Sequence, residues 1–149
     1  MKDSYWTQLK WPAAPNEDDY KVYERYCQGK VLLLGSTKTL LPLASEAWDI
    51  EPQYPITKIK KRDWLTLDEH WDTIILDGGL NLGKDFANDI LRVVLPNCNK
   101  FVCRAFLNPT WQPRYANYFP KANELDPQPL EHSISEVYTF YIWNQKQSS

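Results

Sequence analysis

Five residues of the sequence have the side chains, or in one case the backbone freedom, needed to hold a polar ligand: Gly35, Asp49, Asp63, Asp77 and Arg104. A glycine at the end of a strand allows a sharp turn and a close approach of the backbone to a ligand. A carboxylate accepts hydrogen bonds from a ribose diol or an amino group, and an arginine pairs with a carboxylate through its planar guanidinium. Such a set suits a nucleoside, and an aspartate beside the reacting atoms could also orient or deprotonate a nucleophile.

Each of these positions also has an ordinary structural explanation. Gly35 could serve a turn alone, Asp49 could be a solvated residue at a strand end, and Asp77 could cap the loop that follows it. Arg104 could form a surface ion pair, and Trp64, whose flat face suits a purine, could belong to the core. Their placement in the fold decides between the two explanations.

The elements that must bring these residues together alternate between strands and helices. We expect strands at residues 30–34, 47–50, 58–60, 72–77, 100–106 and 136–143, helices at 16–29 and 84–95, and a short helix at 37–45 that Pro42 interrupts. Alternation of this kind predicts an α/β fold with a Rossmann-like, mostly parallel sheet and helices on both faces. In such a sheet ligands bind beyond the carboxyl ends of the strands, so the five residues should face one crevice.

Two stretches of the chain fit this pattern less well. Residues 51–57, which include Pro52 and Pro55, are fewer than the roughly dozen residues that a parallel crossover normally takes. Their shortness argues against a parallel strand at 58–60. A proline-rich stretch runs from residue 108 to residue 129.

Length, charge and cysteine content limit the class of protein. With 149 residues the chain fits a single domain over 1–149, in which residues 1–15 form an aromatic N-terminal arm. A net charge of −2 gives no broad positive field for nucleic acid. Three cysteines without a CxxC pair fit a reducing compartment, and we expect the cytoplasm. No run approaches the roughly 20 apolar residues of a membrane helix, and two distant histidines give no support for a zinc site.

Several short motifs resemble those of the class I S-adenosylmethionine-dependent methyltransferases. Residues 31–37, Val-Leu-Leu-Leu-Gly-Ser-Thr, resemble the family's cofactor motif at the first strand, and Asp49 stands where the family has an acidic residue after the second. Residues 62–64, Arg-Asp-Trp, resemble the segment with the aspartate beside the adenine. Residues 71–79 resemble the motif that ends the fourth strand, and residues 91–97 resemble the turn before the fifth. The order and spacing agree from the first strand to the fifth.

A closer resemblance is to a bacterial subgroup whose first motif reads Leu-Leu-Gly-Val-Thr-Pro-Glu-Leu and follows a proline-rich arm. Residues 33–40, Leu-Leu-Gly-Ser-Thr-Lys-Thr-Leu, and Trp11-Pro12 fit that variant. Thr37 and Thr39 stand where the common motif has further glycines, and β-branched residues avoid positive φ. The loop is therefore expected to follow a different path from the common one.

The resemblance implies a reduced version of the class I methyltransferase fold, S-adenosyl-L-methionine as the cofactor, and methyl transfer to an acceptor that is a small molecule. It assigns cofactor binding to Gly35, Ser36, Thr37, Asp49, Asp63, Trp64, Asp77 and Gly78. It assigns catalytic roles facing the acceptor to Asp77, Arg104 and His70. No metal, membrane or nucleic acid is implied.

Two other functions are compatible with parts of the sequence. A catalytically silent relative, kept as a binding or assembly module, would suit the altered loop and the short chain, and would depend on Trp6 or Trp11 rather than on Asp49. A nicotinamide dinucleotide site needs Gly-x-Gly-x-x-Gly after the first strand, and this run is absent. The few predicted helices leave part of the sheet uncovered, so the arm, the proline-rich stretch or a second copy in a homodimer should bury it.

Overall fold

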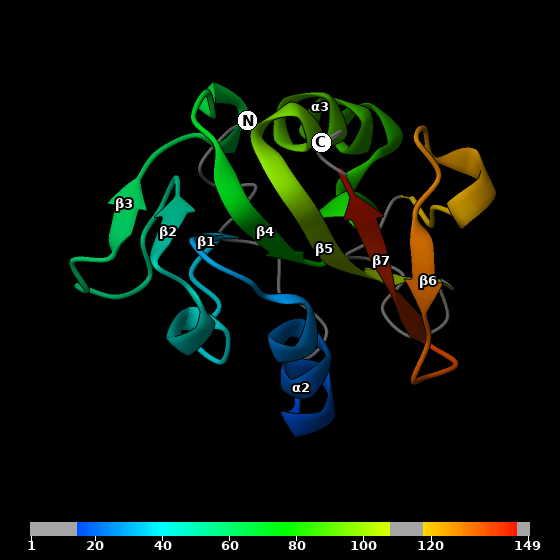
Figure 1. Ribbon diagram of the computed structural model, residues 1–149, viewed down its shortest axis with the longest axis horizontal. Helices are drawn as coiled ribbons and strands as arrows, with labels where there is room; N and C mark the ends of the chain where they lie inside the picture. The colour runs from blue at the N-terminus through cyan, green and yellow to red at the C-terminus, as the bar shows by residue number, and fades with distance from the viewer. Residues whose placement is uncertain (1–14, 108–117, 146–149) are drawn as a thin grey trace.

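Figure 1 shows the computed structural model, which describes residues 15–107 and 118–145. These residues form a seven-stranded sheet of order β3-β2-β1-β4-β5-β7-β6. The strands are β1 (Val31–Leu34), β2 (Glu46–Asp49), β3 (Ile59–Lys61), β4 (Trp71–Asp77), β5 (Cys98–Phe106), β6 (Leu130–His132) and β7 (Tyr138–Asn144). Neighbouring strands from β1 to β5 are parallel, whereas β7 is antiparallel to both β5 and β6. The predicted α/β fold with a mostly parallel sheet is confirmed.

The described residues also form two α-helices, of which the first precedes β1, and several short 3-10 helices. They are α2 (Glu17–Tyr26), α3 (Lys84–Val94), η1 (Leu41–Leu43), η2 (Trp64–Thr66), η3 (Gly79–Leu82), η4 (Leu95–Asn97) and η5 (Ala122–Glu124). α3 lies on one face of the sheet and α2 on the other (Figure 1), as predicted. None of the helices in the described part of the chain is long and apolar enough to cross a membrane.

The central strands are buried on both faces, which explains their continuous apolar sequences. In β1, Leu32 and Leu34 belong to the core cluster beneath α3, whereas Val31 and Leu33 belong to the cluster beneath α2. Alternate side chains of a strand point to opposite faces, so one apolar run serves two cores. This arrangement fixes the centre of the sheet and the position of its carboxyl edge.

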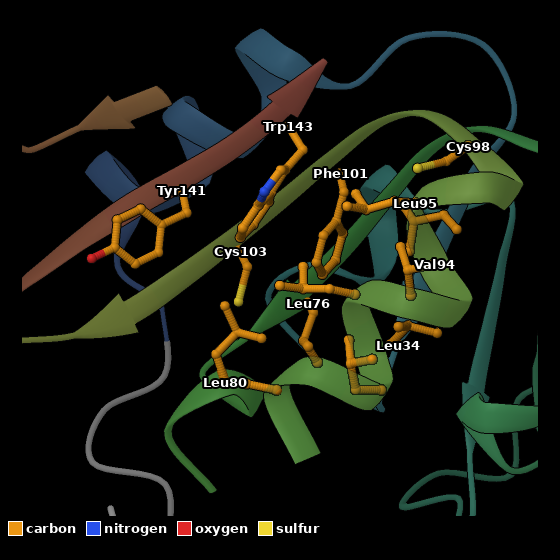
Figure 2. Packing of buried hydrophobic residues seen from close by; sticks show 14 of the residues in the cluster. Leu34, Leu76, Leu80, Val94, Leu95, Cys98, Phe101, Cys103, Tyr141 and Trp143 are labelled. Carbon is orange, nitrogen blue, oxygen red and sulfur yellow. The ribbon is translucent and has the colours of Figure 1, made fainter. Parts of the chain in front are cut away.

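Aromatic side chains fill much of both cores. Figure 2 shows the cluster on the α3 side, where Phe101 stacks on Trp143 with ring centroids 5.3 Å apart and Val94 of α3 lies close by. On the α2 side, Tyr23 meets Phe140 edge-on with centroids 5.2 Å apart. The high aromatic content of the sequence thus serves mainly to bury apolar area.

A capping box starts α2 where the sequence predicts a helix. The Asn16 side chain accepts a hydrogen bond from the Asp19 amide (2.9 Å), and the Asp19 carboxylate accepts one from the Asn16 amide (3.0 Å). Both bonds satisfy amides that have no partner within the helix. The helix runs to Tyr26 and ends before Gly29, whose φ is 62°.

Three local predictions need correction. Of the short, interrupted helix predicted at 37–45, only the 3-10 helix η1 forms, after a turn, and Pro42 lies within η1. The argument against a parallel strand at 58–60 was wrong: β3 pairs in parallel with β2 through a connection that contains no helix. Strand β6 was missed, since it is only three residues long and Leu130 and Glu131 are both exposed. The predicted arm at 1–15 lies almost entirely outside the described residues.

Because two of its thiols have raised pKa values, we expect the protein to lose stability in alkali. Burial raises the pKa of Cys27 to about 11 and that of Cys98 to about 12, whereas unfolded thiols have a pKa of about 8.5. The folded state therefore retains protons that the unfolded chain releases, and its stability is complete below the unfolded value and falls as the pH rises towards the folded values. Urea denaturation should give a midpoint that falls between about pH 9 and about pH 11. A midpoint that stayed constant over this range would contradict the prediction, and Cys27→Ala should reduce the fall.

Candidate functional site

A cavity of about 170 Å³ opens at the carboxyl end of β2. The segment that leads from β3 into η2 lies at the same place. The cavity is lined by one residue from β2, one from α3 and five from the connecting segments: Asp49, Ile50, Arg62, Asp63, Trp64, Leu65 and Phe86. The structure therefore gathers three of the predicted cofactor-binding residues, Asp49, Asp63 and Trp64, in one place. Sequence reasoning placed them there through the rule that ligands bind beyond the carboxyl ends of parallel strands.

Asp49 is held in place by two hydrogen bonds from its own surroundings. The Ser36 hydroxyl donates to one carboxylate oxygen (2.5 Å), and the Glu51 amide donates to the other (2.9 Å). A carboxylate has about four acceptor positions, so each oxygen of Asp49 retains capacity for a further donor. Asp49 lines the cavity, and it can accept hydrogen bonds from a diol bound there.

The backbone conformation at Gly35, where the β1 loop begins, favours glycine, since its φ is 119°. A Cβ at this position would lie 3.8 Å from the six-membered ring of Trp64, an ordinary van der Waals distance. The Gly35 amide and the Trp64 indole N–H both donate to the Trp48 carbonyl, each at 2.7 Å. The start of the loop and one wall of the cavity are therefore fixed by the same backbone atom.

The rest of the β1 loop turns without further glycines. The Thr37 carbonyl accepts hydrogen bonds from the amides of Leu40 and Leu41 (3.0 and 3.1 Å), which closes a turn. No residue other than glycine has positive φ in the described part of the chain. Thr37 does not line the cavity, and neither does Gly78, which has φ 83° and begins the turn after β4.

Asp63 and Trp64 combine structural and possible binding roles. The Asp63 side chain accepts a hydrogen bond from the Leu65 amide (2.9 Å) and so caps η2. Trp64 contacts Phe86 of α3 with ring centroids 6.2 Å apart, and it is half-buried. The core explanation for Trp64 is thus correct in part, while its remaining surface lines the cavity.

Asp77 and Arg104 do not face the crevice, which corrects the prediction that they face the acceptor. Arg104 donates to both oxygens of Asp77 (2.8 and 2.9 Å) and also to Asp19 of α2 (2.9 Å). The Tyr23 hydroxyl donates to Asp77 (2.8 Å), and the Tyr138 hydroxyl donates to Asp19 (2.7 Å). Only 1% of the Arg104 side chain is exposed and 8% of that of Asp77. We call these five residues the buried ionic network.

The buried ionic network arises from the register of the sheet. Asp77 and Arg104 lie opposite each other on the parallel strands β4 and β5, so their side chains share a face, the one that α2 covers. Burial raises the pKa of Asp77, although the Arg104 guanidinium and the Tyr23 hydroxyl act in the opposite direction. The network ties α2 to the carboxyl ends of β4 and β5.

His70 lies at the opposite edge of the sheet, which corrects its predicted catalytic role. It precedes β4, and its Nε2 lies 3.0 Å from Oδ1 of Asn99 near the start of β5. Asp77 ends the same strand seven residues later, which at about 3.3 Å per residue separates the two positions by roughly 20 Å. A residue at the amino end of a parallel strand cannot reach a site at the carboxyl end.

Sequence reasoning missed several residues of the cavity and of the network. Arg62, Ile50, Leu65 and Phe86 line the cavity, and only their positions next to Asp49, Asp63 or a helix start could have pointed to them. Asp19 was explained by the helix dipole, and nothing local predicts that it pairs with a strand residue 85 positions away. In residues 15–107 and 118–145, no group of three His, Cys, Asp or Glu side chains is arranged to hold a metal ion.

Solved structures of methyltransferases share this fold. The magnesium protoporphyrin IX methyltransferase of Synechocystis PCC 6803, bound to SAH, is 12% identical with a TM-score of 0.57, over 93% of this chain and 90% of that one. The glycopeptide N-methyltransferase MtfA, also bound to SAH, is 15% identical with a TM-score of 0.51, over 92% and 62%. CalO1, a methyltransferase of calicheamicin biosynthesis, is 12% identical with a TM-score of 0.53, over 84% and 52%.

Sequence comparison adds no relative: no protein-family model matches the chain, and no curated protein matches it significantly. At the identities above, structural similarity demonstrates a shared fold and nothing finer. The chain therefore shares its fold with solved methyltransferases, and no helix lies between its β2 and β3.

Proposed function

We propose that this protein binds S-adenosylmethionine, with the nucleoside in the cavity beside Asp49, and transfers the methyl group to an acceptor. One observation carries the proposal: Asp49, with acceptor capacity to spare, lines a cavity with Asp63 and Trp64 at the carboxyl end of β2. The class I methyltransferase fold supports it, because related structures are bound to SAM or SAH.

The cavity suits part of the cofactor. Its volume of about 170 Å³ is smaller than the roughly 300–1,000 Å³ of pockets that enclose whole ligands, so it would take the nucleoside and leave the amino acid portion outside. Asp49 would accept hydrogen bonds from the ribose hydroxyls, and Asp63 would accept from the adenine amino group. Trp64 and Phe86 offer aromatic surface to the purine.

For methyl transfer, the main task of the protein is to orient the two reactants. When bound, S-adenosylmethionine supplies an electrophilic methyl group, whose bond to sulfur breaks as a lone pair of the acceptor forms the new bond, leaving S-adenosylhomocysteine. Asp49 would fix the ribose, and Trp64 would fix the base against the β1 loop that it contacts. Holding two reactants in line accounts for much of the acceleration of such displacements.

Calorimetric titration with S-adenosylmethionine and S-adenosylhomocysteine tests the proposal directly. We expect saturable binding of both, with dissociation constants in the range of about 1–100 μM. Asp18→Asn serves as a matched control, because it changes an exposed carboxylate on α2 far from the cavity. Absence of heat with both ligands at about 1 mM, where even a binding free energy of about −4 kcal/mol gives half saturation, would reject the proposal.

One observation favours a second candidate, a catalytically silent binding or assembly module. Asp77 and Arg104, which were expected to act on the acceptor, bind each other and Asp19 instead. Under this second function Asp49→Ala should leave biological activity intact, whereas replacing Trp6 or Trp11, both outside the described residues, should damage it. Under the methyltransferase function the effects should be reversed.

A further inference from the structure

Two cations flank Trp48 beside the cavity. Lys60 of β3 lies opposite Trp48 in the parallel pairing with β2, so the two side chains share a face of the sheet. The Arg62 guanidinium lies over the same indole ring, 4.9 Å from its centroid. Both cations are exposed, and Arg62 also lines the cavity. Lys61, between them, points to the opposite face by strand alternation.

Neither cation forms an ion pair with a carboxylate in residues 15–107 and 118–145. The cavity contains two carboxylates, yet each has other partners: Asp49 accepts from Ser36 and Glu51, and Asp63 caps η2. The Arg62 guanidinium lies over the Trp48 ring and is exposed, so its N–H donors can reach a ligand from solvent. A guanidinium binds a phosphate or a carboxylate through its planar fork of donors.

The local charge supports an anionic ligand at this edge of the sheet. Residues 52–62 contain four basic residues and no acidic one, although the whole chain has a net charge of −2. Lys58 is occupied, since its ammonium group donates to the carbonyls of Leu41 and Ala44. Lysines on an edge strand also discourage strand pairing between molecules, and Lys61 can do this alone. That role does not require Arg62, which lines the cavity, to lie over the Trp48 ring.

We propose that Lys60 and Arg62 form a phosphate-binding subsite, so that the cavity takes a nucleotide. Arg62 directly follows β3, two residues after Lys60, so their Cα atoms are at most about 7 Å apart, and a phosphate between the two side chains could accept hydrogen bonds from both. Asp49 and Arg62 line the same cavity, so a nucleoside held by Asp49 would place its phosphate near the two cations. The subsite rests on the nucleoside site proposed above, and its phosphate could belong to a free nucleotide or to a nucleotide of a strand.

Matched lysine variants test the subsite. Adenosine, adenosine 3′,5′-bisphosphate and a short single-stranded oligoadenylate are titrated calorimetrically into the wild type and into Lys60→Gln, Lys61→Gln and Arg62→Gln. We expect one of the phosphorylated ligands to bind about tenfold more tightly than adenosine at low salt, and Lys60→Gln and Arg62→Gln to remove most of this gain. Lys61→Gln should change it by no more than about twofold, because its charge is on the opposite face.

The outcomes separate this subsite from the function proposed above. A gain confined to the oligoadenylate would assign the phosphate to a strand, and a gain with the bisphosphate would assign it to a free nucleotide. If neither phosphorylated ligand binds more tightly than adenosine, the subsite is refuted. It is also refuted if Lys61→Gln weakens binding as much as Lys60→Gln, because the gain would then come from a general positive field. Binding of S-adenosylhomocysteine, measured in the same variants, decides the methyltransferase proposal independently.

Discussion

Replacing Arg104 with methionine should destabilise the folded protein by about 3–5 kcal/mol, the usual cost of removing one partner from a buried ion pair. Methionine fills much of the volume of the arginine stem, so the loss is mainly electrostatic. The substitution leaves the carboxylates of Asp77 and Asp19 buried, with no cation between them. Chemical denaturation at constant m-value measures the change.

Three further variants identify the cause of this loss. Arg104→Lys keeps the charge but not the two bonds to Asp77, and should lie between methionine and the wild type. Adding Asp77→Asn and Asp19→Asn to Arg104→Met should restore part of the lost stability, because the uncompensated charges disappear. A loss below about 1 kcal/mol for Arg104→Met would mean that the network behaves like a surface ion pair, and our description of it would be wrong.

The sheet is predictable wherever one apolar run serves two faces. Val31–Leu34 and Trp71–Asp77 have few polar residues because α2 and α3 cover both sides. The edges are less predictable, since the outer strands β3 and β6 have only three residues each. A strand was expected at β3, but the short connection before it argued against its parallel pairing with β2. Strand β6 is largely exposed and was missed, because only its pairing with β7 distinguishes it from a loop.

The residues of the predicted site also fall into a predictable group and an unpredictable one. Asp49 ends β2 and Asp63 follows β3, and both lie at the carboxyl edge for that reason alone, so topology suffices to bring them together. Asp77 ends β4 and Arg104 lies near the end of β5, but the partners of their side chains depend on what covers the sheet face. Asp19 arrives from α2, outside the parallel core, and takes the arginine. Sequence shows where a strand ends, whereas the partner of a buried charge is set by long-range packing.

Asp49→Asn should lower the affinity for S-adenosylhomocysteine about tenfold or more. The substitution keeps the shape of the side chain and one acceptor oxygen, but it removes the charge that strengthens hydrogen bonds from a diol, and such bonds are worth about 1.5–3 kcal/mol each. Each tenfold change corresponds to about 1.4 kcal/mol. Calorimetric titration of the variant and of the Asp18→Asn control, at a temperature where both are folded, measures the effect.

Ser36→Ala separates binding by Asp49 from its structural role. Ser36 is buried and donates to Asp49, so its loss removes one of the two bonds that orient the carboxylate but leaves the charge in the cavity. If Asp49 binds the ligand, Ser36→Ala should weaken affinity less than Asp49→Asn does. If Asp49 only joins the β1 loop to the end of β2, both substitutions should lower unfolding stability by similar amounts and leave affinity unchanged. Ligand affinity and denaturation, measured on both variants, therefore decide whether this carboxylate serves the ligand or the fold.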